Sequence, residues 1–197
     1  MKATLFFVMI SFVSGVFAQE DYRSQLEKER EKAQLEMLFE VLDSTERKTF
    51  TGICYFPIDT TLIVQAEFHR KKGRKFLMPM TKARDVWYRQ YGTIQFLIRD
   101  TLCSLVVYQN LSLKKKKEYR DYLFLPFRDG TTAISTYGAG RYIDLHKGKS
   151  NTITIDFNKA YHPYCAYSAR YSCPIVPQEN TVIPAITAGE CYVHHED

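Results

Sequence analysis

The segment covering residues 156–180, DFNKAYHPYCAYSARYSCPIVPQEN, gathers most of the side chains in this sequence that could do chemistry. It holds tyrosines, prolines, a histidine and two cysteines, with no apolar run long enough for a helix or strand after Phe157. A long loop stays ordered only where its backbone groups and hydroxyls find hydrogen-bond partners. The segment therefore either closes one end of a β structure as a structural plug or lines a ligand pocket.

We predict a pocket where this segment meets the preceding block, DGTTAISTYGAGRYIDL. Arg141 could present its guanidinium to a carboxylate or phosphate, or form a bidentate ion pair with Asp156 on a facing strand. Ile143 and Leu145 share its side of the strand, so its charge must be paired or lie at a cavity. The ligand is expected to be small and polar or anionic. The candidate ligand-binding residues are Tyr137, Arg141, Asp156, Asn158, Tyr161, Tyr167, Glu179 and Asn180.

An enzyme is an alternative to a binding module. Asp156 or Glu179 as acid or base, with Arg141 holding an anion, would suit a hydrolase or lyase acting on a small polar substrate. The histidine and cysteines of the segment match no closed zinc pattern, so no metal is expected. The glycines of TYGAGRY precede a strand instead of a helix, which excludes a dinucleotide fingerprint and a P-loop. No cofactor is expected.

The N-terminal residues, MKATLFFVMISFVSGVFAQE, resemble a secretory signal. Lys2 precedes a short apolar run, and the run ends in Val-Phe-Ala, with small residues where a signal peptidase cleaves. We predict a signal peptide over residues 1–18 and a periplasmic or secreted protein that begins at Gln19. The run is shorter than the roughly 20 residues of a spanning helix, and no later segment is as apolar, so no membrane span is predicted.

The five cysteines are Cys54, Cys103, Cys165, Cys173 and Cys191. Their odd number forbids complete pairing. Export would place them in an oxidising compartment, where Cys165 and Cys173 would close a short loop. We predict a disulfide between these two, and we interpret Cys54 and Cys103 as small apolar residues of buried strands.

The overall charge does not indicate a nucleic-acid partner. The net charge is +5, with 27 basic and 22 acidic residues. The lysine run at 114–117 has no interleaved aromatic residues and is followed by Glu118 and Asp121. We predict a solvated loop there and no binding of nucleic acid.

Two periodicities predict the elements that must position these residues. Leu35, Leu38, Phe39 and Leu42 recur at helical spacing, so we expect an amphipathic helix within residues 19–49. From residue 50 the apolar residues alternate with polar ones, which is typical of half-buried strands. A mainly β domain over residues 50–192 is predicted, an antiparallel barrel or sandwich of about 8–9 strands, followed by a tail at 193–197. Strands are expected near residues 62–68, 86–91, 94–98, 102–108, 122–127, 141–145, 152–157 and 181–187.

Several long motifs resemble one known family. The blocks FLPFRDGTTAISTYGAGRYIDL, IDFNKAYHPYCAYSARYSCPIVPQEN and IPAITAGE are similar to signature blocks of the bacterial and archaeal DUF1684 family, a domain of unknown function. The resemblance covers about residues 26–192 and implies one intact domain, but no particular reaction. The sequence departs from the family pattern at His162, where Asn is usual.

Three functions fit the sequence. The first is an exported small-molecule binding or accessory module with a pocket lined by Tyr, Arg and Asn. The second is the hydrolase or lyase described above. The third is a structural or envelope-interaction protein that docks through its N-terminal helix. The ligand and the oligomeric state stay open.

Overall fold

The computed structural model describes the backbone of residues 4–82 and 84–192, and side chains within these ranges from residue 19 onward. The side chains of the predicted signal peptide and the predicted tail at 193–197 lie outside the described residues. The chain divides into two compact units between Gly52 and Ile53. No helix in the described part of the chain has both the length and the apolar character needed to cross a membrane.

The N-terminal unit is helical, as predicted. It contains α1 (Thr4–Glu36), a π-helical turn η1 (Met37–Val41) and the short α2 (Glu46–Thr49). The predicted apolar face is only partly right, because Leu35 and Phe39 are 52% and 66% exposed. A π-helical turn spaces residues differently from an α-helix, so the helical periodicity does not continue through η1.

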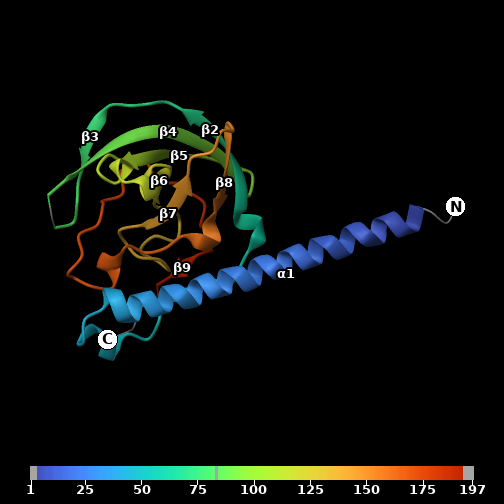
Figure 1. Ribbon diagram of the computed structural model, residues 1–197, viewed down its shortest axis with the longest axis horizontal. Coiled ribbons are helices and arrows are strands. Elements are labelled where there is room, and N and C mark those ends of the chain that lie inside the picture. Colours follow the sequence, from blue (N-terminus) through green and yellow to red (C-terminus); the bar gives the residue numbers. More distant parts are fainter. Residues whose placement is uncertain (1–3, 83, 193–197) are drawn as a thin grey trace. The chain divides into compact units, whose positions relative to one another are not determined.

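Seven of the described strands form one curled antiparallel sheet (Figure 1). Their order is β7-β6-β5-β4-β2-β8, and β3 pairs with β4 beside this path. The predicted mainly antiparallel β fold with an N-terminal helix is confirmed, as a half-barrel whose edges are β7 and β8. The strands are β2 (Ile63–Arg70), β3 (Lys75–Met78), β4 (Val86–Ile98), β5 (Thr101–Asn110), β6 (Tyr122–Phe127), β7 (Arg141–His146) and β8 (Thr152–Asp156).

A second sheet and five short 3-10 turns complete the β-rich unit that begins at Ile53. β1 (Cys54–Tyr55) pairs antiparallel with β9 (Glu190–Cys191). The turns are η2 (Thr60–Leu62), η3 (Leu113–Lys115), η4 (Lys117–Tyr119), η5 (Phe157–Lys159) and η6 (Tyr164–Ala166).

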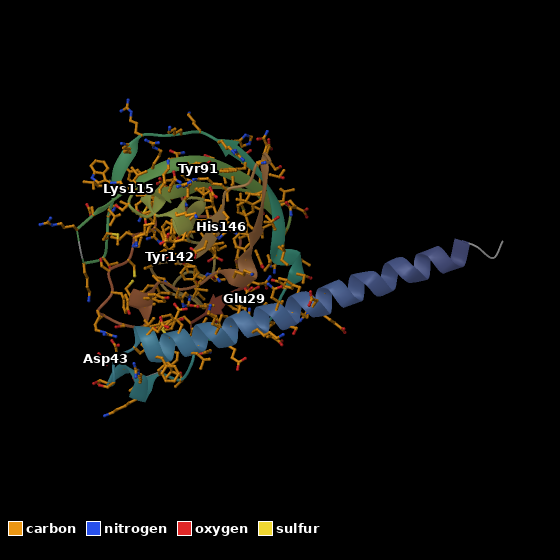
Figure 2. All side chains as sticks on the ribbon, in the orientation of Figure 1. Glu29, Asp43, Tyr91, Lys115, Tyr142 and His146 are labelled. Carbon is orange, nitrogen blue, oxygen red and sulfur yellow. A yellow bond between two sulfur atoms is a disulfide. The ribbon has the colours of Figure 1, made fainter. Side chains whose placement is uncertain are left out.

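The main core fills the inner face of the curled sheet. Leu145 on edge strand β7 and Ile155 on edge strand β8 belong to the same buried cluster, which is possible only if the sheet curls around it. Val182, Ile186 and Ala188 join this cluster from the C-terminal segment. Figure 2 shows Tyr91 and Tyr142 at separate places among the side chains of this unit.

The strand predictions failed where pairing depends on distant residues. Residues 86–91 and 94–98 form a single strand, β4, with a register shift between Gln90 and Gly92. The predicted strand at 181–187 is absent, and only Thr181 makes an isolated bridge, to Arg128. Asn180 precedes this region and completes the ladder with its side chain: its amide bonds both the N–H and the carbonyl of Val106 on β5, at 2.9 and 2.8 Å.

The disulfide of the structure joins Cys54 to Cys191, with the two Cα atoms 5.0 Å apart. These residues face each other across β1 and β9. Cys165 and Cys173 are free thiols, and the Cys165 backbone N–H donates to Cys173 Sγ at 3.2 Å. The predicted Cys165–Cys173 bond and the interpretation of Cys54 as a core thiol are therefore wrong for this structure. Cys103 is a buried thiol, as expected.

Candidate functional site

Arg141 closes one end of the half-barrel. It begins β7, is 1% exposed, and pairs with Asp129, whose Oδ2 lies 3.1 Å from Nη2. The guanidinium also donates to backbone carbonyls of the C-terminal segment, to Ile186 at 2.8 Å, to Glu190 at 3.3 Å and to Ala188. Burial lowers the pKa of Arg141, and the Asp129 carboxylate opposes that shift.

The predicted Arg141–Asp156 pair is wrong. β7 and β8 lie at opposite edges of the sheet and do not form a hairpin. Arg141 is instead opposite Phe127 on β6, and Asp156 is opposite Ile63 on β2. Asp129 was not predicted, although it lies in the same block of sequence as Arg141, DGTTAISTYGAGRYIDL.

Asp156 and Asn158 hold a turn. The Asp156 carboxylate accepts from the Asn158 backbone and side-chain amides at 3.0 and 3.1 Å. Asn158 is 1% exposed, and its side chain donates to the Asp59 carbonyl and accepts from the Asp59 N–H, both at 2.8 Å. These bonds join η5 to the loop before η2.

Three other predicted residues have internal partners away from Arg141. The Tyr161 hydroxyl donates to Asp144 at 2.8 Å. Glu179 accepts from the Tyr108 hydroxyl at 2.8 Å. Asn180 bridges β5 and β6, donating to the Pro126 carbonyl at 2.6 Å as well as bonding β5.

Tyr137 and Tyr167 meet around a buried histidine, His162. The Tyr137 backbone N–H donates to His162 Nε2 at 3.2 Å, which leaves Nδ1 to carry the proton. Nδ1 lies 3.6 Å from Glu190 Oε2, and this oxygen accepts from the Tyr167 hydroxyl at 2.7 Å. Burial and then the Arg141 charge lower the pKa of His162 to about 3, so the imidazole is neutral at pH 7.

The structure thus brings Arg141, Tyr137 and Tyr167 to one buried cluster around His162 and Glu190, and separates the other candidates from it. Their hydrogen bonds are internal to the protein. Ligand binding by these residues stays a prediction. In the described part of the chain no group of three or more His, Cys, Asp or Glu side chains is arranged to hold a metal ion.

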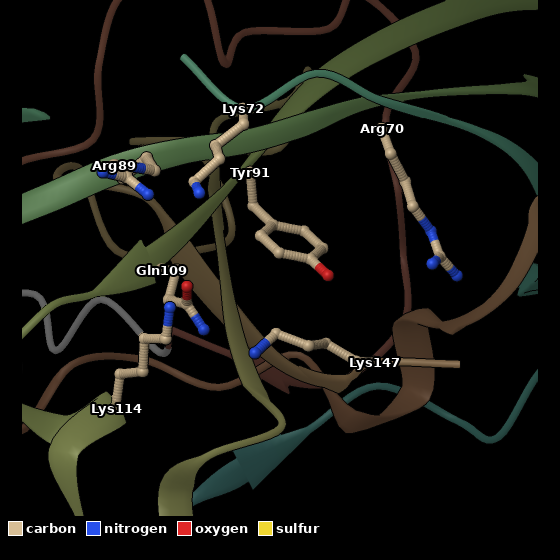
Figure 3. Close-up of a pocket in the computed structure, with 7 residues that line it drawn as sticks. All are labelled: Arg70, Lys72, Arg89, Tyr91, Gln109, Lys114 and Lys147. Carbon is tan, nitrogen blue, oxygen red and sulfur yellow. The ribbon is translucent and has the colours of Figure 1, made fainter. Parts of the chain in front are cut away.

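A basic pocket of about 350 Å³ opens on the curled sheet at another place (Figure 3). Its volume is at the small end of the range for small-molecule sites. None of its lining residues is acidic. They are Arg70, Lys72, Arg89, Tyr91, Gln109, Lys114 and Lys147.

Strand alternation brings polar residues to this pocket. On three strands the inner face continues past the last apolar core residue. Two residues further along, the side chain on this face is polar or cationic, and the three such positions come together at one end of the sheet. The apolar residues are Phe68, Val107 and Leu145, and the residues beyond them are Arg70, Gln109 and Lys147.

A β-bulge supplies the aromatic residue. Gln90 pairs with Tyr108 and Gly92 with Val107, so Tyr91 is the extra residue of β4 and faces the pocket. A Cβ on Gly92 would lie 2.6 Å from the His69 carbonyl oxygen, so the close approach of the paired strands β4 and β2 requires glycine there.

Two loops bring further lysines to the rim. The Gly73 N–H donates to the Gln90 carbonyl at 3.0 Å and fixes the loop that carries Lys72. The Asn110 side chain accepts from the Ser112 and Leu113 N–H groups at 2.9 and 3.0 Å, which starts the turn η3 that carries Lys114.

The electrostatics of the pocket favour an anion. Burial, followed by the charge of Lys114, lowers the pKa of Lys147, whose Nζ lies 5.2 Å from the centre of the Tyr91 ring. The Nε of Arg89 and the Nε2 of Gln109 are buried donors without a hydrogen-bond partner in the described structure. Buried donors of this kind are costly unless an acceptor satisfies them.

Sequence reasoning missed this pocket, but one signal for it was present. Arg70, Gln109 and Lys147 each continue the inner-face alternation of a predicted strand past its last apolar residue. Lys114 belongs to the lysine run that was predicted to be a solvated loop; it is exposed, and it also lines the pocket.

Comparisons with known proteins identify the family. The model of DUF1684, a protein family of unknown function, matches residues 48–191. The chain belongs to the DUF1684 family. A solution NMR structure of an uncharacterized protein from Haloarcula marismortui is similar to it, with 30% identity and a TM-score of 0.68, covering 89% of this chain and 96% of that one. No curated protein matches the chain.

We predict that Asp129→Asn destabilises this DUF1684 domain by about 3–5 kcal/mol, because it leaves the Arg141 charge buried without its partner. Urea denaturation at pH 7 measures the change. Asp100→Asn, at an exposed hairpin turn, is the matched control and should change stability by less than about 0.5 kcal/mol. Equal stability of the two variants would contradict the structural role of the pair.

His162 predicts a loss of stability in acid. Its pKa is about 3 in the folded protein and near 6.5 when unfolded, so between these values the unfolded chain binds more protons. The contribution of His162 to the free energy of unfolding is fully present above about pH 6.5. It decreases as the pH falls towards 3, by at most about 1.4 kcal/mol per pH unit. His162→Asn should reduce this slope in denaturation series, and His146→Asn, an exposed control, should keep it. An unchanged slope in His162→Asn would refute the assignment.

Proposed function

We propose that this protein is an exported module that binds a small anionic ligand in the basic pocket. The observation that carries the proposal is the convergence of five cationic side chains, without an acidic one, on a cavity that contains two buried donors lacking acceptors. An anion would relieve the repulsion between the cations and satisfy the donors together.

The basic pocket is not where the sequence predicted a ligand site. The sequence placed an anionic ligand near Arg141, where Asp129 already neutralises the guanidinium. In the basic pocket the cations have no such partner among the lining residues. Asp156 and Glu179, the acid or base of the hydrolase or lyase alternative, are not lining residues, so no observation at this pocket favours that alternative.

Binding of phosphate tests the proposal. We expect isothermal titration of the full chain with inorganic phosphate at low salt to give saturable binding that weakens as salt is added. Arg89→Gln should weaken it about tenfold or more, since Arg89 loses both charge and donors. Arg99→Gln removes the same charge from the exposed turn beyond β4 and should bind like the wild type. Absence of binding, or equal loss in both variants, would refute the proposal.

Export accounts for the disulfide and the N-terminal sequence together. A bond between Cys54 and Cys191 is typical of an oxidising compartment. We expect native material to begin at Gln19 and to contain this bond, as measured by intact mass and peptide mapping without reductant. A chain that keeps residues 1–18, or that has both thiols free, would contradict export.

A further inference from the structure

An apolar row of three side chains, Leu77, Trp87 and Leu111, adjoins the basic pocket on the same face of the sheet. Leu77 on β3 is directly opposite Trp87 on β4, and the two side chains are 46% and 51% exposed. Leu111, just beyond β5, continues this pairing, because its N–H donates to the Trp87 carbonyl at 2.9 Å. The apolar row therefore crosses three neighbouring segments of chain, over a width of about 10 Å.

The β-bulge at Tyr91 determines the face on which the apolar row lies. After the bulge, the residues of β4 that face the core include Ile94 and Phe96. The extra residue reverses the alternation, so before the bulge the inner-face residues are Arg89 and Trp87. Two residues along a strand span about 7 Å, so the indole of Trp87 and the guanidinium of Arg89 start from adjacent positions of one face.

The row next to it carries the unsatisfied donors of the pocket. Lys75 and Gln109 are opposite Arg89 on its two sides, on β3 and β5. Arg89 and Gln109 line the pocket (Figure 3), and each has a buried donor without an acceptor in the described structure. A small-molecule site typically combines a few such polar groups with apolar and aromatic surface. The two adjacent rows supply both parts.

Exposure alone does not distinguish the apolar row. Leu97 and Leu102 are also opposite each other, on β4 and β5, and are 59% and 68% exposed. They lie at the other end of this hairpin and on the outer face, since Phe96 and Ile98 on either side of Leu97 belong to the core. Scattered exposed apolar residues need no explanation. Continuity with the buried donors is what gives the apolar row a function.

We infer that the ligand is an anionic amphiphile, with its head group bound by Arg89 and Gln109 and an alkyl chain lying along the apolar row. This inference rests on the proposed function and specifies its ligand. The anionic head group complements the cations of the pocket, as that function requires. A chain that crosses the strands covers the whole row, whereas a single ring would cover Trp87 alone. Contact between chain and row removes apolar surface of both from water, which adds to the affinity of the head group.

Methyl phosphate and hexyl phosphate test the inference, because they share a head group and differ in chain length. We expect isothermal titration of the full chain to show at least about tenfold tighter binding of hexyl phosphate, used below its micelle concentration. Leu77→Ser should reduce this advantage at least about threefold and leave the affinity for methyl phosphate within about twofold, because Leu77 does not line the pocket. Leu97→Ser, the control, removes a similarly exposed leucine and should change neither affinity.

Tryptophan fluorescence gives a second measurement. Trp87 is the only tryptophan in the chain, so the emission reports on the apolar row. Hexyl phosphate should shift the emission to shorter wavelength, because its chain displaces water from the indole. Methyl phosphate has no chain to reach the row and should leave the emission wavelength unchanged.

The outcomes separate this inference from the proposed function. Equal affinity for the two esters, an unchanged advantage in Leu77→Ser, an equal loss in Leu97→Ser, or unchanged emission with hexyl phosphate would overturn the amphiphile inference and leave anion binding intact. No binding of either ester or of inorganic phosphate would overturn both.

Lipid vesicles distinguish two sources of such a ligand. Co-sedimentation with vesicles of phosphatidylcholine and phosphatidic acid, weakened by Leu77→Ser, would identify the amphiphile as a membrane lipid. Binding of hexyl phosphate without co-sedimentation would identify it as a free amphiphile.

Discussion

The fold of the β domain depends on one buried ion pair, Arg141 with Asp129. The C-terminal segment 186–190 is largely irregular, and its carbonyls would be buried without partners if Arg141 did not donate to them. Asp129 completes the arrangement from the other side, since its carboxylate accepts both from Arg141 and from the Ile186 N–H, the latter at 2.7 Å. The pair therefore supplies the hydrogen bonds to this backbone that strand pairing supplies in a regular sheet. It brings the apolar side chains of Ile186 and Ala188 onto the core and leads the chain to β9 and the disulfide.

A cationic side chain lies at each end of β7, and the two have different surroundings. Arg141, Ile143 and Leu145 face inward, and Lys147 continues this face just beyond the strand. At the first end the C-terminal segment covers the cation and Asp129 neutralises it, so burial is complete. At the second end the nearest lining charges are positive, and the lysine remains half-buried beside an open cavity. A paired, covered cation is a structural element, whereas an unpaired one at a cavity is available to a ligand.

The sequence predicted what depends on local periodicity. Alternation identified most strands, and the charge-rich segment before residue 50 identified the helix. Strand order is not local, and the errors follow from that: Asp156 was paired with Arg141 because their strands are consecutive, yet β8 lies beside β2 at the far edge. Cys54 and Cys191 are 137 residues apart and meet only through β1 and β9. The site was missed for a related reason, since Tyr91 faces the pocket through a bulge that breaks the alternation of β4.

The basic pocket also lowers the stability of the folded protein when no ligand is bound. Five cations around one cavity repel each other, and two buried donors lack acceptors. Other buried amides are satisfied: Asn158 bonds Asp59 in both directions, and Asn180 bonds β5 and β6. The Nε of Arg141, at the other end of β7, also lacks an acceptor, but the charge of that side chain is paired with Asp129. A chain that satisfies those amides fully could have placed an acceptor opposite Gln109 or a carboxylate beside Arg89. Local departures from full satisfaction are characteristic of functional sites, where a bound ligand supplies the missing groups. The contrast between the two ends of the sheet is therefore the strongest physical reason to look for the function at the end that remains open.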